Sequence, residues 1–340
     1  MISERIFGQT AQGDTVRAFT LKSGENGATV LNYGGIVQSI SIRGKNGKDY
    51  NVVLGYNGVE EYENGGGYLG AFIGRVGNRI EKGRFTLDGK QYQLNLNNGN
   101  HHIHGGFQGF NRKLMNAEMD GNVLILSARS EDCEENYPGN LGIEVRYSFD
   151  NGALKLEYTA IPDKKTPINL TNHSYFNLNG QGSSDILGHT LFIDADKITP
   201  TDEELIPHGE FRNVEGTPFD FRTPKKIGKD IFCREDSDVA NGGGYDVNYV
   251  LNGGGFRKVA EATGDESGIR MEVLTDLPGV QFYSGNMLSD GRYRKHDGFC
   301  LETQLLPNAV NCPAYMAYGN PFFDENRAFR SVTVYRFIAG

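Results

Sequence analysis

Short segments that alternate between apolar and polar residues, separated by glycine-containing turns, run along almost the whole chain. Two of them carry a strong hairpin signal: Asp88-Gly89 interrupts RFTLDGKQYQLN (84–95), and Asn151-Gly152 interrupts GIEVRYSFDNGALKLEYTAI (142–161). Asp-Gly and Asn-Gly pairs between alternating runs predict tight turns that join antiparallel strands. The same pattern continues in segments 27–42, 122–130, 189–201 and 330–337. Alternation over so much of the chain predicts an all-β fold.

Segments with a helical pattern are few and short, and the two candidates are 57–64 and 223–231. No linker or run of like charges divides the chain. With 340 residues, the chain is long enough to bury a large core as one unit. We therefore expect residues 1–340 to form a single large antiparallel β domain with few short helices.

The charge and the apolar pattern exclude two classes of partner. The net charge is −9 at pH 7, whereas nucleic acids and anionic membranes attract clusters of Lys and Arg. The stretch MISERIFGQTAQGD lacks the apolar core of a signal peptide, and no apolar run is long enough to span a bilayer. We expect a cytoplasmic protein with no nucleic-acid partner and no membrane partner.

The four cysteines are scattered and form no CxxC pair: Cys133, Cys233, Cys300 and Cys312. This spacing favours reduced thiols over a disulfide framework or a zinc site. The glycine-rich stretch GGGYLG (65–70) fits the letters of a dinucleotide-binding loop, but no helix pattern follows it. We interpret its glycines as loop residues that adopt positive φ angles.

Two stretches contain histidines that need an explanation. His173 lies in LTNHSYFNL (170–178), which otherwise reads as a strand, and NGNHHIHGGFQGF (98–110) contains His102 and His104. Histidines two positions apart share one face of a strand, which suggests a metal site. However, Gln108 and Gly109 stand where such a motif needs a glutamate. Capping of a glycine-rich turn is the alternative, and we expect no bound metal.

A carboxylate follows the apolar residues of GFCLETQLLPNAVN (298–311), so that Glu302 is expected at the end of a strand. A carboxylate in apolar surroundings is costly unless it is paired or functional, although a surface position is the simpler reading. Asp246 in GGGYDVNYVL raises the same question. Histidine titrates near neutral pH and a glutamate can accept a proton. Together these residues suggest acid/base chemistry on a small polar molecule, without a cofactor.

Five motifs occur in one order along the chain: GRVGNRIEKGRFTLDG (74–89), IHGGFQGF (103–110), LTNHSYFNL, LPGVQFYSGN (277–286), and GFCLETQ followed by PNAVN. Together they resemble the aldose 1-epimerase (galactose mutarotase) family. The resemblance implies a large antiparallel β-sandwich, the galactose mutarotase-like supersandwich, with a sugar held in an open cleft. It also implies the interconversion of the α and β anomers of free hexoses such as galactose and glucose, by a monomer or homodimer.

Residue roles follow from the same resemblance. His173 matches the general acid that protonates the ring oxygen O5, and Glu302 matches the general base that takes the proton of the C1 hydroxyl. His104 matches a second histidine near O5. The residues that match binders of sugar hydroxyls are Asn78, Arg79, Asp246 and Gln281. The chain departs from the family at His101 and His102, which receive no catalytic role, and at Asn136, where the family commonly has glycine.

Three alternatives stay open at this point. A non-catalytic sugar-binding module would use the same cleft, although such modules typically stack sugars on Trp, which this chain lacks. A glycosidase needs two carboxylates that flank the bond, and Asp246 and Glu302 are the candidates. A hexose 6-phosphate epimerase needs a basic pocket for the phosphate, and no Arg/Lys pair lies beside the motifs.

Overall fold

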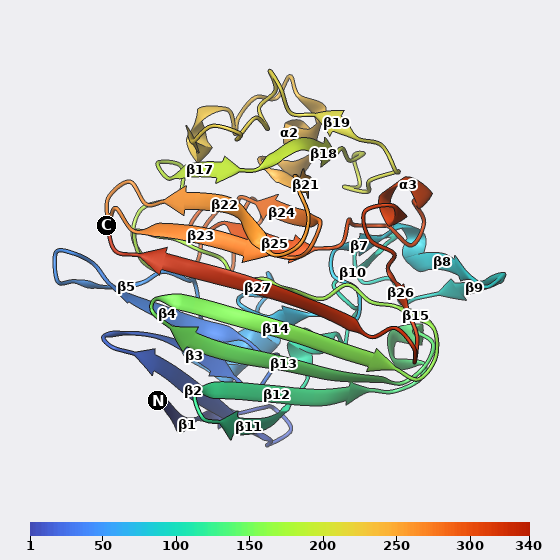
Figure 1. The fold of residues 1–340 in the computed structure, drawn as a ribbon, viewed down its shortest axis with the longest axis horizontal. Helices are drawn as coiled ribbons and strands as arrows, with labels where there is room; N and C mark the ends of the chain where they lie inside the picture. Colours follow the sequence, from blue (N-terminus) through green and yellow to red (C-terminus); the bar gives the residue numbers. More distant parts are fainter.

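A nine-stranded antiparallel sheet forms the largest layer of the computed structural model, which describes residues 1–340 (Figure 1). Its strands, in spatial order, are β11 (Asn116–Asp120), β12 (Val123–Ser130), β13 (Leu141–Asp150), β14 (Ala153–Pro162), β27 (Phe329–Ile338), β23 (Arg270–Thr275), β22 (Arg257–Thr263), β17 (Thr190–Ile193) and β20 (Lys225–Lys226). The last long strand of the chain, β27, lies at the centre of this sheet, between β14 and β23.

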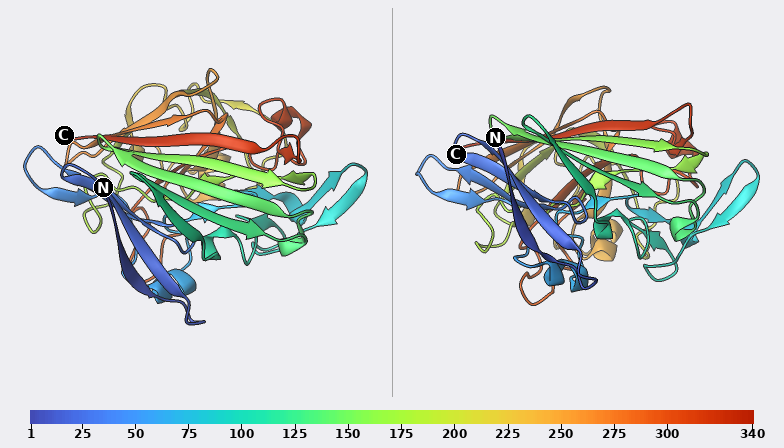
Figure 2. Two further views of the ribbon diagram at one scale, coloured as in Figure 1. Left: turned by 60° about the horizontal axis from the view of Figure 1, so that its bottom comes forward. Right: turned by 90° about the horizontal axis from the view of Figure 1, so that it is seen from below.

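Two five-stranded sheets pack with this layer, as the further views in Figure 2 show. The first contains β1 (Ile2–Gln9), β2 (Thr15–Ser23), β3 (Asn26–Leu31), β4 (Val37–Arg43) and β5 (Asp49–Asn51). The second contains β19 (Arg212–Asn213), β18 (Ala195–Thr199), β21 (Asp246–Leu251), β24 (Gly279–Tyr283) and β25 (Cys300–Gln304). The prediction of a large antiparallel β-sandwich is confirmed.

Four short strand pairs lie outside these three sheets. They are β6 (Phe72–Ile73) with β16 (Thr171–Asn172), β7 (Arg79–Ile80) with β10 (His102–Ile103), β8 (Arg84–Leu87) with β9 (Lys90–Gln93), and β15 (Thr166–Pro167) with β26 (Phe322–Phe323). The β8–β9 hairpin projects at the end of the molecule opposite the two termini (Figure 2).

Both predicted hairpins are present. Asp88-Gly89 joins β8 to β9, and Asn151-Gly152 joins β13 to β14. All four turn residues have positive φ angles, between 48° and 79°. Two-residue turns of this kind match the twist of the flanking strands, which explains why Asn-Gly and Asp-Gly predict them well. Buried and more exposed residues then alternate along β13, as expected for a strand with one face on the core.

The helices are short: α1 (Val59–Asn64), α2 (Ser237–Gly242) and α3 (Pro313–Met316). The helix predicted at 57–64 is confirmed as α1, but the helix predicted at 223–231 is wrong. That segment contains strand β20, which pairs with β17, followed by a single 3₁₀ turn at Ile227–Lys229. Backbone pairing with a neighbouring strand therefore overrides the local helical pattern. None of the helices is long and apolar enough to cross a membrane.

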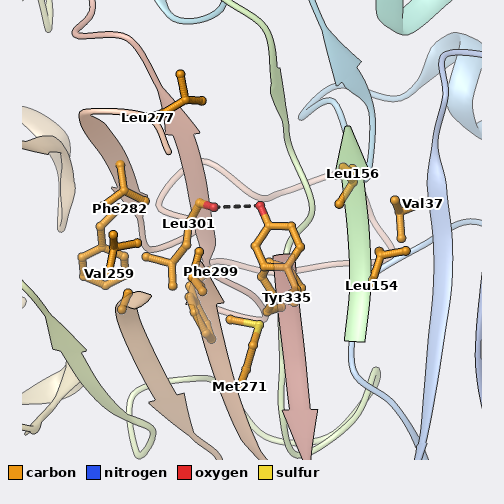
Figure 3. Packing of buried hydrophobic residues seen from close by; sticks show 14 of the residues in the cluster. Val37, Leu154, Leu156, Val259, Met271, Leu277, Phe282, Phe299, Leu301 and Tyr335 are labelled. Atoms are coloured by element: carbon orange, nitrogen blue, oxygen red, sulfur yellow. Dashed lines mark hydrogen bonds between the residues drawn. The ribbon is translucent and has the colours of Figure 1, made fainter. Parts of the chain in front are cut away.

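A cluster of 58 buried hydrophobic residues fills the space between the sheets. Figure 3 shows part of it, where Tyr335 of β27 donates a hydrogen bond of 3.0 Å from its hydroxyl to the carbonyl oxygen of Leu301 in β25. Phe299 and Leu301 both pack into this cluster. Because successive side chains of a strand point to opposite faces, Cys300 and Glu302 are directed to the other side of β25. The core thus fixes the strand that carries the predicted base.

Candidate active site

A cleft of about 220 Å³ lies on the second five-stranded sheet, beside the loops that precede β7 and follow β16. All seven residues that the motifs indicated line this one cleft: Asn78, Arg79, His104, His173, Asp246, Gln281 and Glu302. They come from segments between residues 78 and 302, so the fold gathers side chains that are far apart in the sequence. The remaining lining residues are Gly67, Tyr68, Asn97, Asn98, Ile103, Tyr175, Tyr283, Met287 and Leu288.

His173 and Glu302 face each other in this cleft, with 3.7 Å between Nε2 and Oε1. His173 directly follows β16, and its backbone is held at both ends: its N–H donates to the carbonyl of Ala71, and its carbonyl accepts from the N–H of Gly70. Glu302 lies in the middle of β25, opposite Gln281 of β24, and not at a strand end as expected from the sequence. Hydrogen-bonded backbone on both sides therefore fixes where these two side chains lie.

Burial shifts the pKa values of this pair in opposite directions. His173 is 4 % exposed and Glu302 is 3 % exposed. Burial lowers the pKa of His173 to about 4, because a charged imidazole loses its hydration. Burial, together with the negative charge of Asp246, raises the pKa of Glu302 well above its usual range. In the sugar-free cleft, the pair therefore favours the state in which both groups are neutral and Glu302 carries the shared proton.

His104 lies edge to face with His173, and the ring centroids are 5.2 Å apart. Its Nδ1 accepts a hydrogen bond of 3.1 Å from the backbone N–H of Asn78. The proton of the neutral ring is therefore on Nε2, which makes His104 a donor. Burial, followed by the proximity of His173, lowers the pKa of His104 well below its usual value. His104 is thus a neutral donor at pH 7.

The prediction that His102 and His104 share one face of a strand is wrong. Strand β10 ends at Ile103, and His104 adopts a left-handed backbone conformation with φ of 51°. His102 is fully buried elsewhere, with its Nδ1 2.8 Å from the carbonyl oxygen of Asn95 and its Nε2 2.7 Å from the hydroxyl of Tyr137. His102 is therefore a structural residue outside the cleft.

The predicted hydroxyl-binding residues form a hydrogen-bonded chain along the floor of the cleft. The side-chain amide of Asn78 donates to Oε1 of Gln281 over 3.0 Å, and Nε2 of Gln281 donates to Oδ1 of Asp246 over 2.7 Å. Arg79 donates from Nε to Asn98 and forms no ion pair. Burial raises the pKa of Asp246, although the charge of Arg79 opposes this shift. The chain fixes which amide atoms are donors and which are acceptors before a ligand arrives.

One carboxylate oxygen of Glu302 forms no hydrogen bond with the protein. Oε2 is buried and has no hydrogen-bond partner among the protein groups. Buried polar atoms are nearly always hydrogen-bonded, so an unpartnered carboxylate oxygen inside a cleft indicates a ligand that donates to it. A sugar hydroxyl is such a donor.

His104, His173 and Glu302 also place three potential metal-ligand atoms within 4.8 Å of one another. The hydrogen bonding of His104 argues against such a site. Its Nδ1 already accepts the backbone N–H of Asn78, so its Nε2 carries the ring proton and neither nitrogen offers a free lone pair. The trio suits proton transfer better than metal coordination.

Sequence reasoning assigned no role to the aromatic wall of the cleft. Tyr68 comes from the glycine-rich stretch GGGYLG, and its ring lies 4.7 Å from that of His104 and 5.9 Å from that of His173. Tyr175 lies 5.0 Å from His173, and Tyr283 packs against both rings, 6.0 Å from Tyr175 and 6.4 Å from His173. These rings supply the apolar surroundings that shift the pKa values. Tyr175, two positions after His173, was visible in the motif, but Tyr68 needed the structure.

His101, which received no catalytic role from the motifs, does not line the cleft. Its Nδ1 accepts the backbone N–H of Lys82, and its Nε2 is 3.3 Å from Oε2 of Glu204. His101 therefore connects the loop before β10 to the loop that follows β18. All four cysteines are free, as expected, and Cys300 lies beside His173.

A β-supersandwich with a buried histidine and glutamate facing each other across a polar cleft is typical of an enzyme that acts by proton transfer. Comparison with known proteins identifies the kind of enzyme. The family model described as "Aldose 1-epimerase" matches residues 17–316. The chain belongs to the aldose 1-epimerase family, and the predicted enzyme class, an isomerase of this type, is confirmed.

Individual relatives match over nearly their full length. A galactose mutarotase from Bos taurus is 42% identical over 323 residues, which cover 92% of this chain and 93% of the relative. An aldose 1-epimerase from Escherichia coli (strain K12) is 34% identical over 338 residues, 96% of each chain. The crystal structure of galactose 1-epimerase from Lactobacillus acidophilus NCFM has a TM-score of 0.88, with 27% identity and coverage of 100% of this chain and 99% of that one.

Proposed function

We propose that this protein interconverts the α and β anomers of free hexoses such as galactose and glucose, and that His173 and Glu302 move the protons. The observation that carries the proposal is the distance of 3.7 Å between Nε2 of His173 and Oε1 of Glu302 inside a buried cleft. A group at each end of this gap can reach O5 and the C1 hydroxyl of one pyranose ring. Each positioned proton-transfer group typically contributes about 10²–10⁴-fold.

Ring opening needs a protonated His173 and an ionised Glu302. The carboxylate takes the proton of the C1 hydroxyl, a C=O double bond forms at C1, and the C1–O5 bond breaks. The electron pair of that bond goes to O5, which takes the proton from Nε2 of His173. The products are an open-chain aldehyde, a neutral His173 and a protonated Glu302.

Ring closure repeats these steps in reverse on the other face of the aldehyde. After rotation about C1–C2, the O5 hydroxyl attacks C1 and returns its proton to His173. Glu302 returns its proton to O1, and the opposite anomer is released. Protons alone are exchanged, and the enzyme ends in its starting state, so that the reaction balances without a cofactor.

The burial of the pair favours the step that opens the ring. In the reactive complex the closed sugar faces the ion pair, whereas the open aldehyde is accompanied by two neutral groups. Because burial lowers the pKa of His173 and raises the pKa of Glu302, the cleft stabilises the neutral state relative to the ion pair. The surroundings thereby lower the free energy of the open-chain intermediate relative to the reactive complex of the pyranose with the ion pair.

The other cleft residues orient the sugar. His104 offers a fixed Nε2–H donor next to His173. The chain of Asn78, Gln281 and Asp246 offers amide donors and carboxylate acceptors whose directions are set by their mutual hydrogen bonds. Orientation of this kind keeps O5 and O1 at the two proton-transfer groups. The sugar is the only partner that the reaction requires, and a monomer or homodimer can perform it.

Polarimetry on freshly dissolved α-galactose and α-glucose, in solutions of low buffer concentration, tests the proposal. We expect the protein to accelerate the approach to the anomeric equilibrium for at least one of them. Methyl α-galactoside is the matched control, because it lacks the C1 hydroxyl proton and cannot open. Release of galactose from this glycoside would instead identify a glycosidase, and binding without acceleration would identify a sugar-binding protein.

A phosphorylated hexose is the second candidate substrate because a cation lies just beyond the cleft. A neighbouring hollow of about 190 Å³ shares Gly67, Tyr68 and Asn97 with the cleft and is lined by the exposed Arg112. Polarimetry with glucose 6-phosphate beside glucose separates the two candidates. We expect the free sugar to have the higher kcat/KM, since Arg79 is the only Lys or Arg side chain that lines the cleft itself.

A further inference from the structure

The imidazole of His173 lies between two side chains of one strand. Its Nδ1 is 3.5 Å from Sγ of Cys300, and its Nε2 is 3.7 Å from Oε1 of Glu302. Cys300 and Glu302 are two positions apart in β25, so they point to the same face with a spacing of about 6.6 Å along the strand. Strand β25 therefore presents one side chain to each nitrogen of the ring.

The proposed reaction sets a requirement for Nδ1. Nε2 must give a proton to O5 and take it back, so the neutral ring must keep its other proton on Nδ1 in every cycle. A proton that stays on Nδ1 inside a buried site needs an acceptor. Cys300 Sγ, 3.5 Å from Nδ1, is the side-chain hydrogen-bond partner of this imidazole.

The thiol of Cys300 is suited to accept a hydrogen bond from His173. It can orient the imidazole without favouring the protonated, charged form of that ring. The side chain is fully buried, and burial raises the pKa of its thiol well above the usual value, so the sulfur remains neutral. A neutral sulfur is a weak acceptor. A carboxylate at the same place would raise the pKa of His173, whereas a neutral thiol leaves it low.

We propose that Cys300 is a positioning residue that accepts a hydrogen bond from Nδ1–H of His173 and thereby keeps the lone pair of Nε2 directed at Glu302 and the substrate. The proposal rests on the proposed function of His173 in proton transfer. It gives the two cleft histidines opposite tautomers. His104 carries its proton on Nε2, because Asn78 donates to its Nδ1, and His173 carries its proton on Nδ1.

Nuclear magnetic resonance of the ¹⁵N-histidine-labelled protein at pH 7, without sugar, tests the tautomers directly. The spectra of His173→Asn and His104→Asn assign the two rings. We expect a protonated Nδ1 and an unprotonated Nε2 for His173, and the reverse for His104. A native His173 with its proton on Nε2 would overturn the proposal.

Variants of Cys300 test whether the contact sets the tautomer. Cys300→Ala removes the acceptor, and we expect a mixed tautomer pattern for His173 and a fall in kcat of about threefold to tenfold, the worth of one hydrogen bond, with little change in KM. Cys300→Ser keeps an acceptor and should restore both the pattern and kcat. Cys312→Ala is the control, because it truncates a buried thiol that does not line the cleft.

The outcomes separate this proposal from the proposed function. An unchanged tautomer pattern or an unchanged kcat in folded Cys300→Ala would overturn the positioning role. If that variant does not fold, the native spectrum and the Cys300→Ser variant still decide the matter. A native protein that does not accelerate mutarotation would refute the proposed function, while the tautomers would still be measured on the sugar-free protein.

Discussion

His104 and His173 meet edge to face, with 5.2 Å between their ring centroids and an angle of 82° between the ring planes. Positive charge on one ring disfavours positive charge on the other, and this proximity is one cause of the lowered pKa of His104. The two rings therefore cannot share the same role. One is available to carry the proton of the reaction, and the other remains a neutral donor.

The activity should depend on pH through the proton shared by His173 and Glu302. Below a pH of about 4, the pKa of His173, the pair gains a second proton and the base is lost. Above the raised pKa of Glu302, the pair loses its only proton and the acid is lost. We expect a bell-shaped profile of kcat/KM with its acid limb near pH 4. An acid limb near 6.5, the ordinary histidine pKa, would contradict the desolvation of His173.

Removing the charge of Asp246 should shift the alkaline limb of the pH profile of kcat/KM. The carboxylate of Asp246 raises the pKa of Glu302, so Asp246→Asn should lower that pKa and shift the alkaline limb to lower pH. KM should also rise, because Asp246 is a proposed binder of sugar hydroxyls. Full pH profiles of kcat/KM for the native and variant proteins check both effects. An unchanged alkaline limb would show that Asp246 does not influence the base.

Substitution of the neighbouring histidines should separate stability from catalysis. His102→Ala leaves the carbonyl of Asn95 and the hydroxyl of Tyr137 without a buried partner, at a cost of about 1–3 kcal/mol for each group. We expect a lower free energy of unfolding with kcat close to native. For His104→Ala we expect a free energy of unfolding close to native and a large loss of kcat/KM. Denaturant titration and polarimetry on both variants provide the comparison, and a large loss of kcat in folded His102→Ala would contradict it.

We also propose that residues 1–340 unfold as one domain. The main hydrophobic cluster includes Phe19 of the N-terminal sheet, Phe282 of the cleft-bearing sheet and Phe337 of the nine-stranded sheet. Residues that share one core should lose their packing together. Calorimetry and circular dichroism should give one coincident thermal transition. Two separated transitions would indicate that the sheets form independent units.

Features that depend on local chemistry could be predicted from the sequence. The Asp88-Gly89 and Asn151-Gly152 hairpins follow from residues that accept positive φ angles in a two-residue turn. The cleft residues could be predicted because each of them lies within a short motif that resembles the family. Each motif also contains the strand or loop that positions its residue. Asn136 adopts a φ of 68°, and asparagine tolerates this left-handed backbone, so the departure from glycine at that position is accommodated.

Features that depend on distant partners could not be predicted. The sequence spacing of His102 and His104 suggests one face of a strand, but the left-handed backbone at His104 separates them. Segment 223–231 has a helical pattern, yet β20 pairs with β17. Tyr68 packs against His104 and His173, and Cys300 lies against Nδ1 of His173. Each of these contacts joins residues more than 30 positions apart in the chain.

The most direct test is polarimetry on α-galactose with the native protein, Glu302→Gln, His173→Asn and the double variant, each first shown to be folded. Each single variant should lose at least about 100-fold in kcat/KM. The double variant should be little slower than either single variant, because one proton serves both groups. Near-native activity in either single variant would show that the pair formed by His173 and Glu302 does not carry the reaction.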